Sequence, residues 1–332
     1  MPPAGPLPPG TESFVYGGRR VAIRTVWADT LEAEFATIRV LAERYRYVAM
    51  VRNSPRRNSH CKRSGPAHPS PRAARPRLRL TPRAPDLPRS LGSARLAAQD
   101  TEFPGVVVRP MGSFASTADY HYQTMRVNVD LLRVIQLGLT FADENGELAE
   151  GVPTWQFNFR FSLGEDIYAQ DSIELLARAG IDFAEHRERG IDVEHFGELL
   201  LSSGLVLTDE VKWVSFHSGY DFGYLLKLLT ALPLPADEAQ FFALMRQYFP
   251  VLFDVKQLMT VSDALRGGLQ RLADDLALER VGPMHQAGSD SLLTCAAFFR
   301  LRKSFFGGRL DERRYNGVLF GLGGQPQQLL AT

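Results

Sequence analysis

The sequence predicts an α/β fold organised as a single domain. Segments with the apolar spacing of amphipathic helices alternate with short apolar runs typical of strands across most of the 332 residues. No apolar run approaches the ~20 residues that a membrane-spanning helix needs. The Pro- and Gly-rich start lacks the features of a secretory signal, and two cysteines, Cys61 and Cys295, are too few for a disulfide framework. Together these features predict a soluble protein of a reducing compartment.

The first expected helix begins at Asp29 or Thr30, either of which can cap it, and ends near Arg44. Further helices are expected over residues 118–131, 171–179, 192–202, 221–232, 236–248, 267–277 and 289–305. The expected strands cover residues 47–50 continued by 100–103, then 134–141, 154–161, 211–216 and 251–255. Residues 134–141 are almost all apolar and predict a buried strand, whereas 154–161 alternate and predict an antiparallel strand buried on one face. We expect residues 1–22 to be flexible and residues 323–332 to be frayed.

Residues 51–99 differ from the rest of the chain. They hold 11 Arg and one Lys against one acid, Asp86, with eight Pro and no Phe, Trp, Tyr or Ile. The net charge of +1 therefore combines a block of +11 with a body of −10. So few apolar side chains cannot offset the entropy of ordering the block, which we expect to be disordered. It is either an insert without a selected role or a basic arm that binds nucleic acid or directs the chain to the nucleus.

The boundaries of this block indicate a retained intron. Its removal joins Met50 to Asp100 and restores one strand, YVAMDTEFPG. Val codons begin with GT and one Gln codon is CAG, so a block from Val51 to Gln99 can be a translated GT…AG intron. Suitable residues at both ends occur by chance roughly once in a hundred. We therefore predict an insert at 51–99 within a domain formed by residues 23–50 and 100–322.

Five residues in three separate segments are candidates for chemistry. Asp100 and Glu102 are two apart on the expected strand, so both carboxylates lie on one face of it. Asp221 follows the strand at 211–216, and His285 precedes Asp290 by five residues. Each also has an ordinary structural explanation. The strand acids can meet solvent, Asp221 and Asp290 can cap helices, and His285 can be a packed side chain.

Ser289 can replace Asp290 as a cap, and we expect Asp254, at another strand end, to take no part in the chemistry. Asp-x-Glu on the first strand, an Asp after a later strand and His-x₄-Asp near the end form the pattern of DEDD exonucleases of the histidine subtype. The surrounding segments resemble the Caf/Pop-type poly(A) deadenylase subunit of the CCR–NOT complex over residues 23–50 and 100–322. These segments are RVNVDLLRVIQLGLTF, WQFNFRFSL, EDIYAQDSIELL, WVSFHSGYDFGYLLKLLT and HQAGSDSLLTCAAFF.

The resemblance implies an RNase H-like fold, with a mixed central sheet flanked by helices. It implies a 3′-to-5′ exoribonuclease that shortens mRNA poly(A) tails and releases 5′-AMP with two Mg²⁺ or Mn²⁺ ions, which suit carboxylate ligands. By position in the motifs, the four acidic metal ligands and the general base correspond to Asp100, Glu102, Asp221, Asp290 and His285.

The resemblance also implies partners and places. The family binds the large NOT scaffold subunit beside a second deadenylase, and in animals BTG/Tob-type adaptors, in the nucleus and cytoplasm including mRNA-decay bodies. A body of −10 has few cations for RNA phosphates. Adenines would therefore be held by stacking and base-edge contacts, with Phe103 as a candidate for the terminal nucleotide.

Two accounts of activity remain open. All five site residues are present, which favours an enzyme. The insert splits the first active-site strand, which favours a catalytically impaired form that acts as a scaffold or adaptor subunit. A third hypothesis gives the basic block a role of its own in RNA binding or nuclear import.

Overall fold

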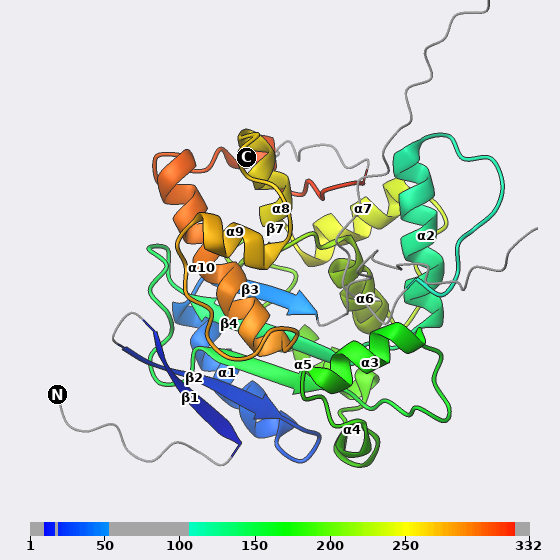
Figure 1. Cartoon of the computed structure of the whole chain (residues 1–332), viewed down its shortest axis with the longest axis horizontal. Helices are drawn as coiled ribbons and strands as arrows, with labels where there is room; N and C mark the ends of the chain where they lie inside the picture. The colour runs from blue at the N-terminus through cyan, green and yellow to red at the C-terminus, as the bar shows by residue number, and fades with distance from the viewer. Residues whose placement is uncertain (1–9, 17–18, 53–105, 323–332) are drawn as a thin grey trace, which may run out of the picture. The chain divides into compact units, whose positions relative to one another are not determined.

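A seven-stranded mixed sheet lies at the centre of this computed structural model, which describes residues 10–16, 19–52 and 106–322 (Figure 1). Side by side, the strands are β1 (Thr11–Tyr16), β2 (Arg19–Val26), β5 (Thr154–Asn158), β4 (Gln136–Ala142), β3 (Tyr47–Arg52), β6 (Lys212–Ser215) and β7 (Val251–Asp254). β4 runs antiparallel to β3 and β5, and β1 antiparallel to β2, whereas the remaining pairs are parallel. The predicted α/β class is confirmed.

One face of the sheet packs against a layer of five helices. They are α1 (Leu31–Arg44), α2 (Thr117–Leu131), α5 (Val193–Leu201), α6 (Gly219–Thr230) and α7 (Glu238–Tyr248). The core of this layer holds the rings of Phe35, Phe157 and Phe196, whose centroids lie between 5.0 and 5.7 Å apart. Val48 and Met50 of β3 belong to this core, so alternate residues of β3 face this layer.

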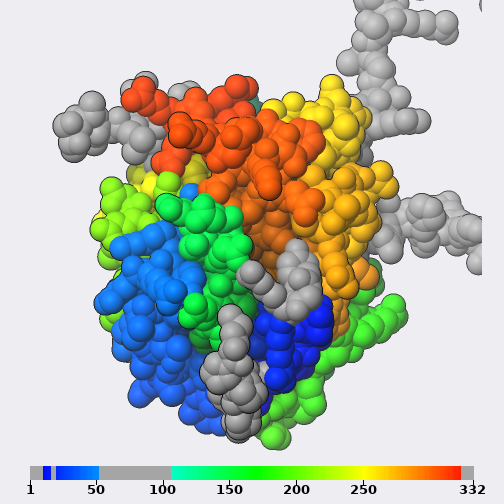
Figure 2. Space-filling view, turned by 90° about the vertical axis from the view of Figure 1, so that its left-hand side faces the viewer, coloured from blue at the N-terminus to red at the C-terminus, as the bar shows by residue number. Residues whose placement is uncertain are grey.

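The other face of the sheet packs against α8 (Val255–Leu258), α9 (Leu269–Asp275) and α10 (Ala287–Phe305). Figure 2 views the side on which α10, in orange, lies above the dark-blue N-terminal strands. Tyr47 and Ala49 of β3 belong to this second core, where Tyr47 lies 5.9 Å from Phe298 of α10 between ring centroids. Because side chains alternate along a strand, position 51 also faces the α10 layer.

The smaller elements are α3 (Gln170–Arg178), α4 (Phe183–Arg189), the 3₁₀ turn Met259–Val261 and α11 (Glu312–Tyr315). Among the helices of the described ranges, none has both the length and the apolar content to cross a membrane. The described residues fall in a unit formed by Met1–Arg56 with Asp100–Thr332. A second unit, Arg57–Gln99, lies outside them, so the expected disorder of the insert and fraying of residues 323–332 are not described.

The N-terminal expectation was wrong in part. Residues 1–22 were expected to be flexible, but β1 and the first half of β2 lie within that segment. Val21 and Ile23 of β2 are buried against Val281 and Leu292, and β2 pairs in parallel with β5. The missed signal is the Gly-Gly pair at 17–18 between two short polar–apolar runs, a common hairpin sequence.

The two strands expected at 134–141 and 154–161 are both present, with one correction. β4 is buried throughout, as expected. β5 is also buried throughout, although its alternation predicted one exposed face. It ends at Asn158, earlier than expected, and Phe159 forms only an isolated bridge to Ile191. Helices on both faces of the sheet account for the difference, because they cover the polar as well as the apolar side of β5.

The first predicted strand differs at its end. β3 runs past Met50 and includes Val51 and Arg52, which pair with Gly138 and Leu137 of β4. Val51 is 7% exposed. The first two residues of the predicted insert therefore continue the strand in the register that Asp100 and Thr101 were expected to occupy. The expected continuation at 100–103 lies outside the described residues.

Candidate active site

The structure describes three of the five predicted catalytic residues, Asp221, His285 and Asp290. Asp100 and Glu102 lie outside the described residues, as does Phe103. Asp221 approaches the edge of the sheet from the α6 layer, at the carboxyl end of β6. His285 and Asp290 flank the start of α10 in the opposite layer.

Asp221 lies in the first turn of α6 but does not cap it. The helix begins at Gly219, earlier than expected, and Ser218 is the N-cap residue. Asp221 is therefore the third helical residue, and it is 9% exposed. Asp221 is therefore not the N-cap residue, although its charge still complements the helix dipole in the first turn.

Asp254 fixes the segment that precedes Asp221. Its carboxylate accepts hydrogen bonds from the backbone N–H groups of His217 (2.7 Å), Ser218 (3.3 Å), Lys256 (2.9 Å) and Phe320 (3.0 Å). His217 has a φ of 55°, a conformation that costs a non-glycine residue about 1–2 kcal/mol. Asp254, 1% exposed, thus has a structural role in holding this turn.

The start of α10 rests directly on the sheet beside the end of β3. Gly138 of β4 pairs with Val51 of β3. A Cβ atom at Gly138 would lie 1.9 Å from the carbonyl oxygen of Ala287, so only glycine permits this approach. The residue before the N-cap, His285, has a φ of 62° and turns the chain into the helix. The predicted base is therefore held in a tight turn at the sheet.

Asp290 lies in the first turn of α10 and pairs with Arg280. Gln286 is the N-cap residue, so neither Ser289 nor Asp290 caps the helix as considered above. The Arg280 guanidinium forms an ion pair with Asp290 Oδ1 and donates to Ser289 Oγ at 3.0 Å and to Gln270 Oε1 at 2.7 Å. Asp290 is buried, with 4% of its side chain exposed, and Arg280 is partly buried, with 13% exposed.

The second carboxylate oxygen of Asp290 is available for another cation. Oδ2 is buried and accepts no hydrogen bond from the part of the chain that the structure describes. A buried carboxylate oxygen without a donor carries a large desolvation cost unless a cation meets it. The same part of the chain holds no cluster of three or more His, Cys, Asp or Glu side chains placed to bind a metal, and two of the four predicted ligands lie outside it. The carboxylate oxygens of the two described ligands, Asp221 and Asp290, fit a hard divalent cation.

Arg280 and the amide side chains around the start of α10 are not recognisable in the sequence as part of a site. Gln136, Gln156, Asn158 and Gln286 form a hydrogen-bonded group there. No local motif marks these residues, because they come from two strands and a helix end. Their partners are set by the packing of α10 on the sheet.

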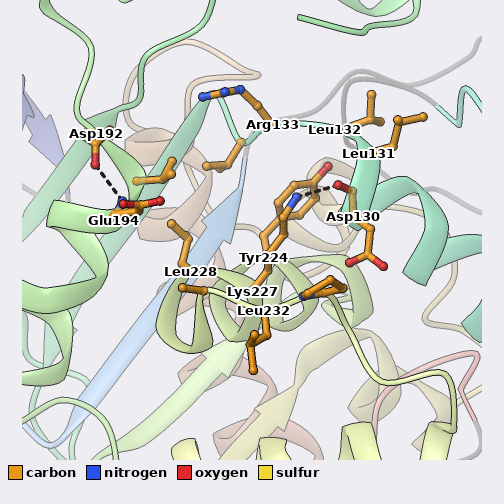
Figure 3. Close-up of a pocket in the computed structure, with 14 residues that line it drawn as sticks. Asp130, Leu131, Leu132, Arg133, Asp192, Glu194, Tyr224, Lys227, Leu228 and Leu232 are labelled. Carbon is orange, nitrogen blue, oxygen red and sulfur yellow. Dashed lines mark hydrogen bonds between the residues drawn. The ribbon is translucent and has the colours of Figure 1, made fainter.

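A cavity of about 540 Å³ lies elsewhere, between the ends of α2, α5 and α6 (Figure 3). Lys227 reaches into it and donates to the carbonyl oxygens of Val129 and Asp130, the last turn of α2 (2.9 and 2.8 Å). Burial lowers the pKa of Lys227. Asp192 on the opposite wall caps α5. None of Asp221, His285 and Asp290, the predicted catalytic residues that the structure describes, lines this cavity, so we separate it from the candidate active site.

Comparison with known proteins gives a consistent result. Residues 78–194 and 204–298 match the family described as CAF1 family ribonuclease. Poly(A) ribonuclease pop2 of Schizosaccharomyces pombe is 53% identical over 228 residues, which cover 69% of this chain and 68% of that protein. Probable CCR4-associated factor 1 homolog 10 of Arabidopsis thaliana is 46% identical over 308 residues, 91% of this chain and 93% of that protein.

Solved structures agree with the sequence matches. S. pombe Pop2p in its Mg²⁺- and Mn²⁺-bound form superposes with a TM-score of 0.74 at 43% identity, over 90% of this chain and 99% of that one. Yeast CAF1, crystallised with the NOT1 MIF4G domain, superposes with a TM-score of 0.63 at 30% identity, over 90% of this chain and 96% of that one. The expected RNase H-like fold is confirmed.

Proposed function

Because the chain belongs to the CAF1 family of ribonucleases, we propose that it shortens mRNA poly(A) tails from the 3′ end and releases 5′-AMP as a catalytic subunit of a CCR–NOT complex. The relative named poly(A) ribonuclease pop2 supports poly(A) RNA as the substrate. The yeast CAF1 structure with the NOT1 MIF4G domain supports the scaffold partner.

The observation that carries the proposal is the register of β3. In a chain without residues 51–99, Asp100 follows Met50 and takes the position of Val51, opposite Gly138. Two residues further along the same face, Glu102 falls opposite Gln136. Both carboxylates then point into the α10 layer, at the start of the helix that carries Asp290. Because β6 is parallel to β3, Asp221, which follows β6, lies at the same end of the strands as the carboxyl end of β3.

The donor set supports a site for two Mg²⁺ or Mn²⁺ ions held by Asp100, Glu102, Asp221 and Asp290. The buried Oδ2 of Asp290, which accepts no hydrogen bond from the described residues, fits a cation ligand, and the S. pombe Pop2p structure has Mg²⁺ and Mn²⁺ bound. Such ions supply a nucleophilic water at neutral pH and stabilise the departing 3′ oxygen.

The protein's own groups perform the remaining work. His285 would accept a proton from the attacking water at neutral pH, a role for which an imidazole side chain is suited. Arg280 holds the Asp290 carboxylate by Oδ1, which would leave Oδ2 to bind the cation. We assign Phe103 to contact with the terminal nucleotide, and place the protein in the nucleus and cytoplasm, including mRNA-decay bodies, with BTG/Tob-type adaptors as further partners.

The structure of β3 gives a physical reason for weak catalytic activity in the full chain. In the register of β3, the apolar and buried Val51 occupies the position that the first metal ligand needs. This supports the alternative that the 332-residue form acts mainly as a scaffold or adaptor subunit. The form without residues 51–99 is then the enzyme.

A deadenylation assay tests the activity itself. The form without residues 51–99 is incubated with 5′-labelled oligo(A) and Mg²⁺ or Mn²⁺, and the products are separated by length and by nucleotide. We expect a ladder shortened from the 3′ end, release of 5′-AMP, and no reaction after Asp100→Ala. A substrate with a blocked 3′ hydroxyl is the control. Internal cleavage of that blocked RNA, or retained activity in Asp100→Ala, would contradict the proposal.

A further inference from the structure

Side chains of the sheet hold the start of α10. The first N–H groups of a helix have no acceptor within the helix, and the N-cap residue Gln286 provides no side-chain cap here. Instead, the N–H of Ala287 donates to Gln136 Oε1 at 3.3 Å, and the N–H of Gly288 donates to Gln156 Oε1 at 2.9 Å. Strands β4 and β5 therefore cap a helix of the adjacent layer.

The same glutamines bind one another through their amide N–H groups. Gln136 Nε2 donates to Asn158 Oδ1 at 2.7 Å and to Gln286 Oε1 at 3.3 Å, and Gln156 Nε2 donates to Gln286 Oε1 at 3.0 Å. Gln286 in turn donates to the carbonyl oxygen of Ala179 at 2.8 Å. Gln136 and Gln156 are 2% and 9% exposed. We call these four side chains, Gln136, Gln156, Asn158 and Gln286, the amide clamp.

Two glycines allow the helix start to come this close. A Cβ at Gly138 would meet the backbone of Ala287, as described above. A Cβ at Gly288 would lie 2.7 Å from Ile23 Cγ2 and 3.2 Å from Gln156 Oε1. The clamp and the glycines act on the same short segment, which has His285 on one side and Asp290 on the other.

From this arrangement we propose that Gln136 and Gln156 are positioning residues for catalysis, which set the place of His285 and Asp290 through the backbone of Ala287 and Gly288. The inference rests on the proposed function, which assigns catalytic roles to His285 and Asp290. Displacement of a catalytic group by about 1 Å can reduce a rate on the order of 100-fold. Loss of one clamp acceptor would therefore reduce kcat and leave binding of the poly(A) chain, hence KM, largely unchanged.

The variants remove the acceptor and keep the size of the side chain. Gln136→Met and Gln156→Met retain length without an oxygen, and Gln156→Glu restores an acceptor for the N–H of Gly288. The matched control is Asn316→Leu. Asn316 is a buried amide (1% exposed) that accepts from the N–H of Leu252 at 2.9 Å, on β7. It fixes backbone in the same manner on β7, which contacts α10 through Phe298 and not through the start of the helix.

The first measurement is hydrogen–deuterium exchange of the full chain, followed by mass spectrometry of the peptide that spans residues 283–291. We expect faster exchange at Ala287 and Gly288 in both Met variants, partial recovery in Gln156→Glu, and the wild-type rate in Asn316→Leu. This measurement needs no activity. Unchanged exchange in the Met variants would overturn the proposal, whether or not the protein is a deadenylase.

The second measurement is kcat and KM on oligo(A), for the full chain and in parallel for the form without residues 51–99. We expect kcat to fall on the order of 100-fold in the Met variants, KM to change less than about 3-fold, and Gln156→Glu to recover part of kcat. If faster exchange is accompanied by wild-type kcat, or by a loss no larger than in Asn316→Leu, the glutamines have only a structural role. If neither wild-type form hydrolyses oligo(A), the proposed function fails, and exchange alone then decides the clamp.

Discussion

Arg280→Ala should destabilise the fold strongly, because Arg280 neutralises a buried carboxylate. Only 4% of the Asp290 side chain is exposed, and Oδ2 already lacks a donor among the described residues. Removal of Arg280 leaves Asp290 as a buried charge without its cation, a change that typically costs about 3–5 kcal/mol of unfolding free energy. For a protein of this size, each kcal/mol lowers Tm by about 1.5–2 °C. We therefore expect Tm to fall by about 5–10 °C.

The assay is thermal and urea unfolding of the full chain without added metal, followed by circular dichroism. Arg271→Ala is the matched control, because Arg271 pairs with Asp275 on α9 and is 69% exposed. Exposed pairs of this kind contribute about 0–1 kcal/mol. In the Arg280→Ala background, Asp290→Asn should recover part of the lost stability, since it removes the unpaired charge.

Equal losses of Tm in Arg280→Ala and Arg271→Ala would refute this reasoning. Such a result would mean that Asp290 is as well solvated as a surface carboxylate. The case for a cation at Oδ2 would then lose its physical basis. A further loss on adding Asp290→Asn would refute it too.

Three further predictions concern the same layer and its surroundings. Gly138→Ala should lower the unfolding free energy by about 1–3 kcal/mol, because the new methyl group meets the backbone of Ala287. Gly164→Ala should leave the unfolding free energy nearly unchanged, because its surroundings are open. Calorimetry measures Tm for both variants, and equal Tm values for the two variants would contradict the prediction. Burial lowers the pKa of His186, so the unfolded chain binds more protons than the folded chain below the ordinary histidine pKa of about 6.5, and stability should fall as pH falls below that value. In His186→Asn, the unfolding free energy from urea unfolding at several pH values should depend less steeply on pH. An unchanged pH dependence of the unfolding free energy would contradict the assignment. In the form without residues 51–99, millimolar Mn²⁺ should raise Tm, because binding at 100 times Kd adds about 2.7 kcal/mol to the unfolding free energy. Asp290→Asn should reduce this rise in Tm. No rise in Tm in the form that retains Asp290 would count against an assembled metal site.

The elements predicted best are those whose own sequence determines them. The apolar run at 134–141 predicted β4, and the capping residues and apolar face that begin near Leu31 predicted α1. Helix starts that depend on tertiary contacts were predicted too late. α6 begins at Gly219 after a turn held by Asp254, and α10 begins at Ala287, where strand glutamines act as caps. Sequence spacing carries no information on partners of this kind.

The candidate site was predictable only in part, for the same reason. Asp221, His285 and Asp290 were predicted from their order along the chain, and the structure places Asp221 in the first turn of α6 and the other two at the start of α10. Arg280 and the amide clamp were not identified, because their role arises from packing between α10 and strands far away in sequence. The position of Asp100 could not be predicted either, since β3 accepts Val51 and Arg52 as readily as Asp100 and Thr101 in hydrogen-bond terms.

The central claim is that residues 51–99 displace the first metal ligand from β3. The most direct test is the ratio of kcat/KM on oligo(A) between the form without residues 51–99 and the full chain, both purified and checked for equal secondary structure. Loss of a metal-ligand carboxylate removes transition-state stabilisation that, by analogy with loss of one stabilising hydrogen-bond donor, is worth on the order of 100-fold or more. We predict a ratio of at least that size. Equal kcat/KM values for the two forms would contradict the account.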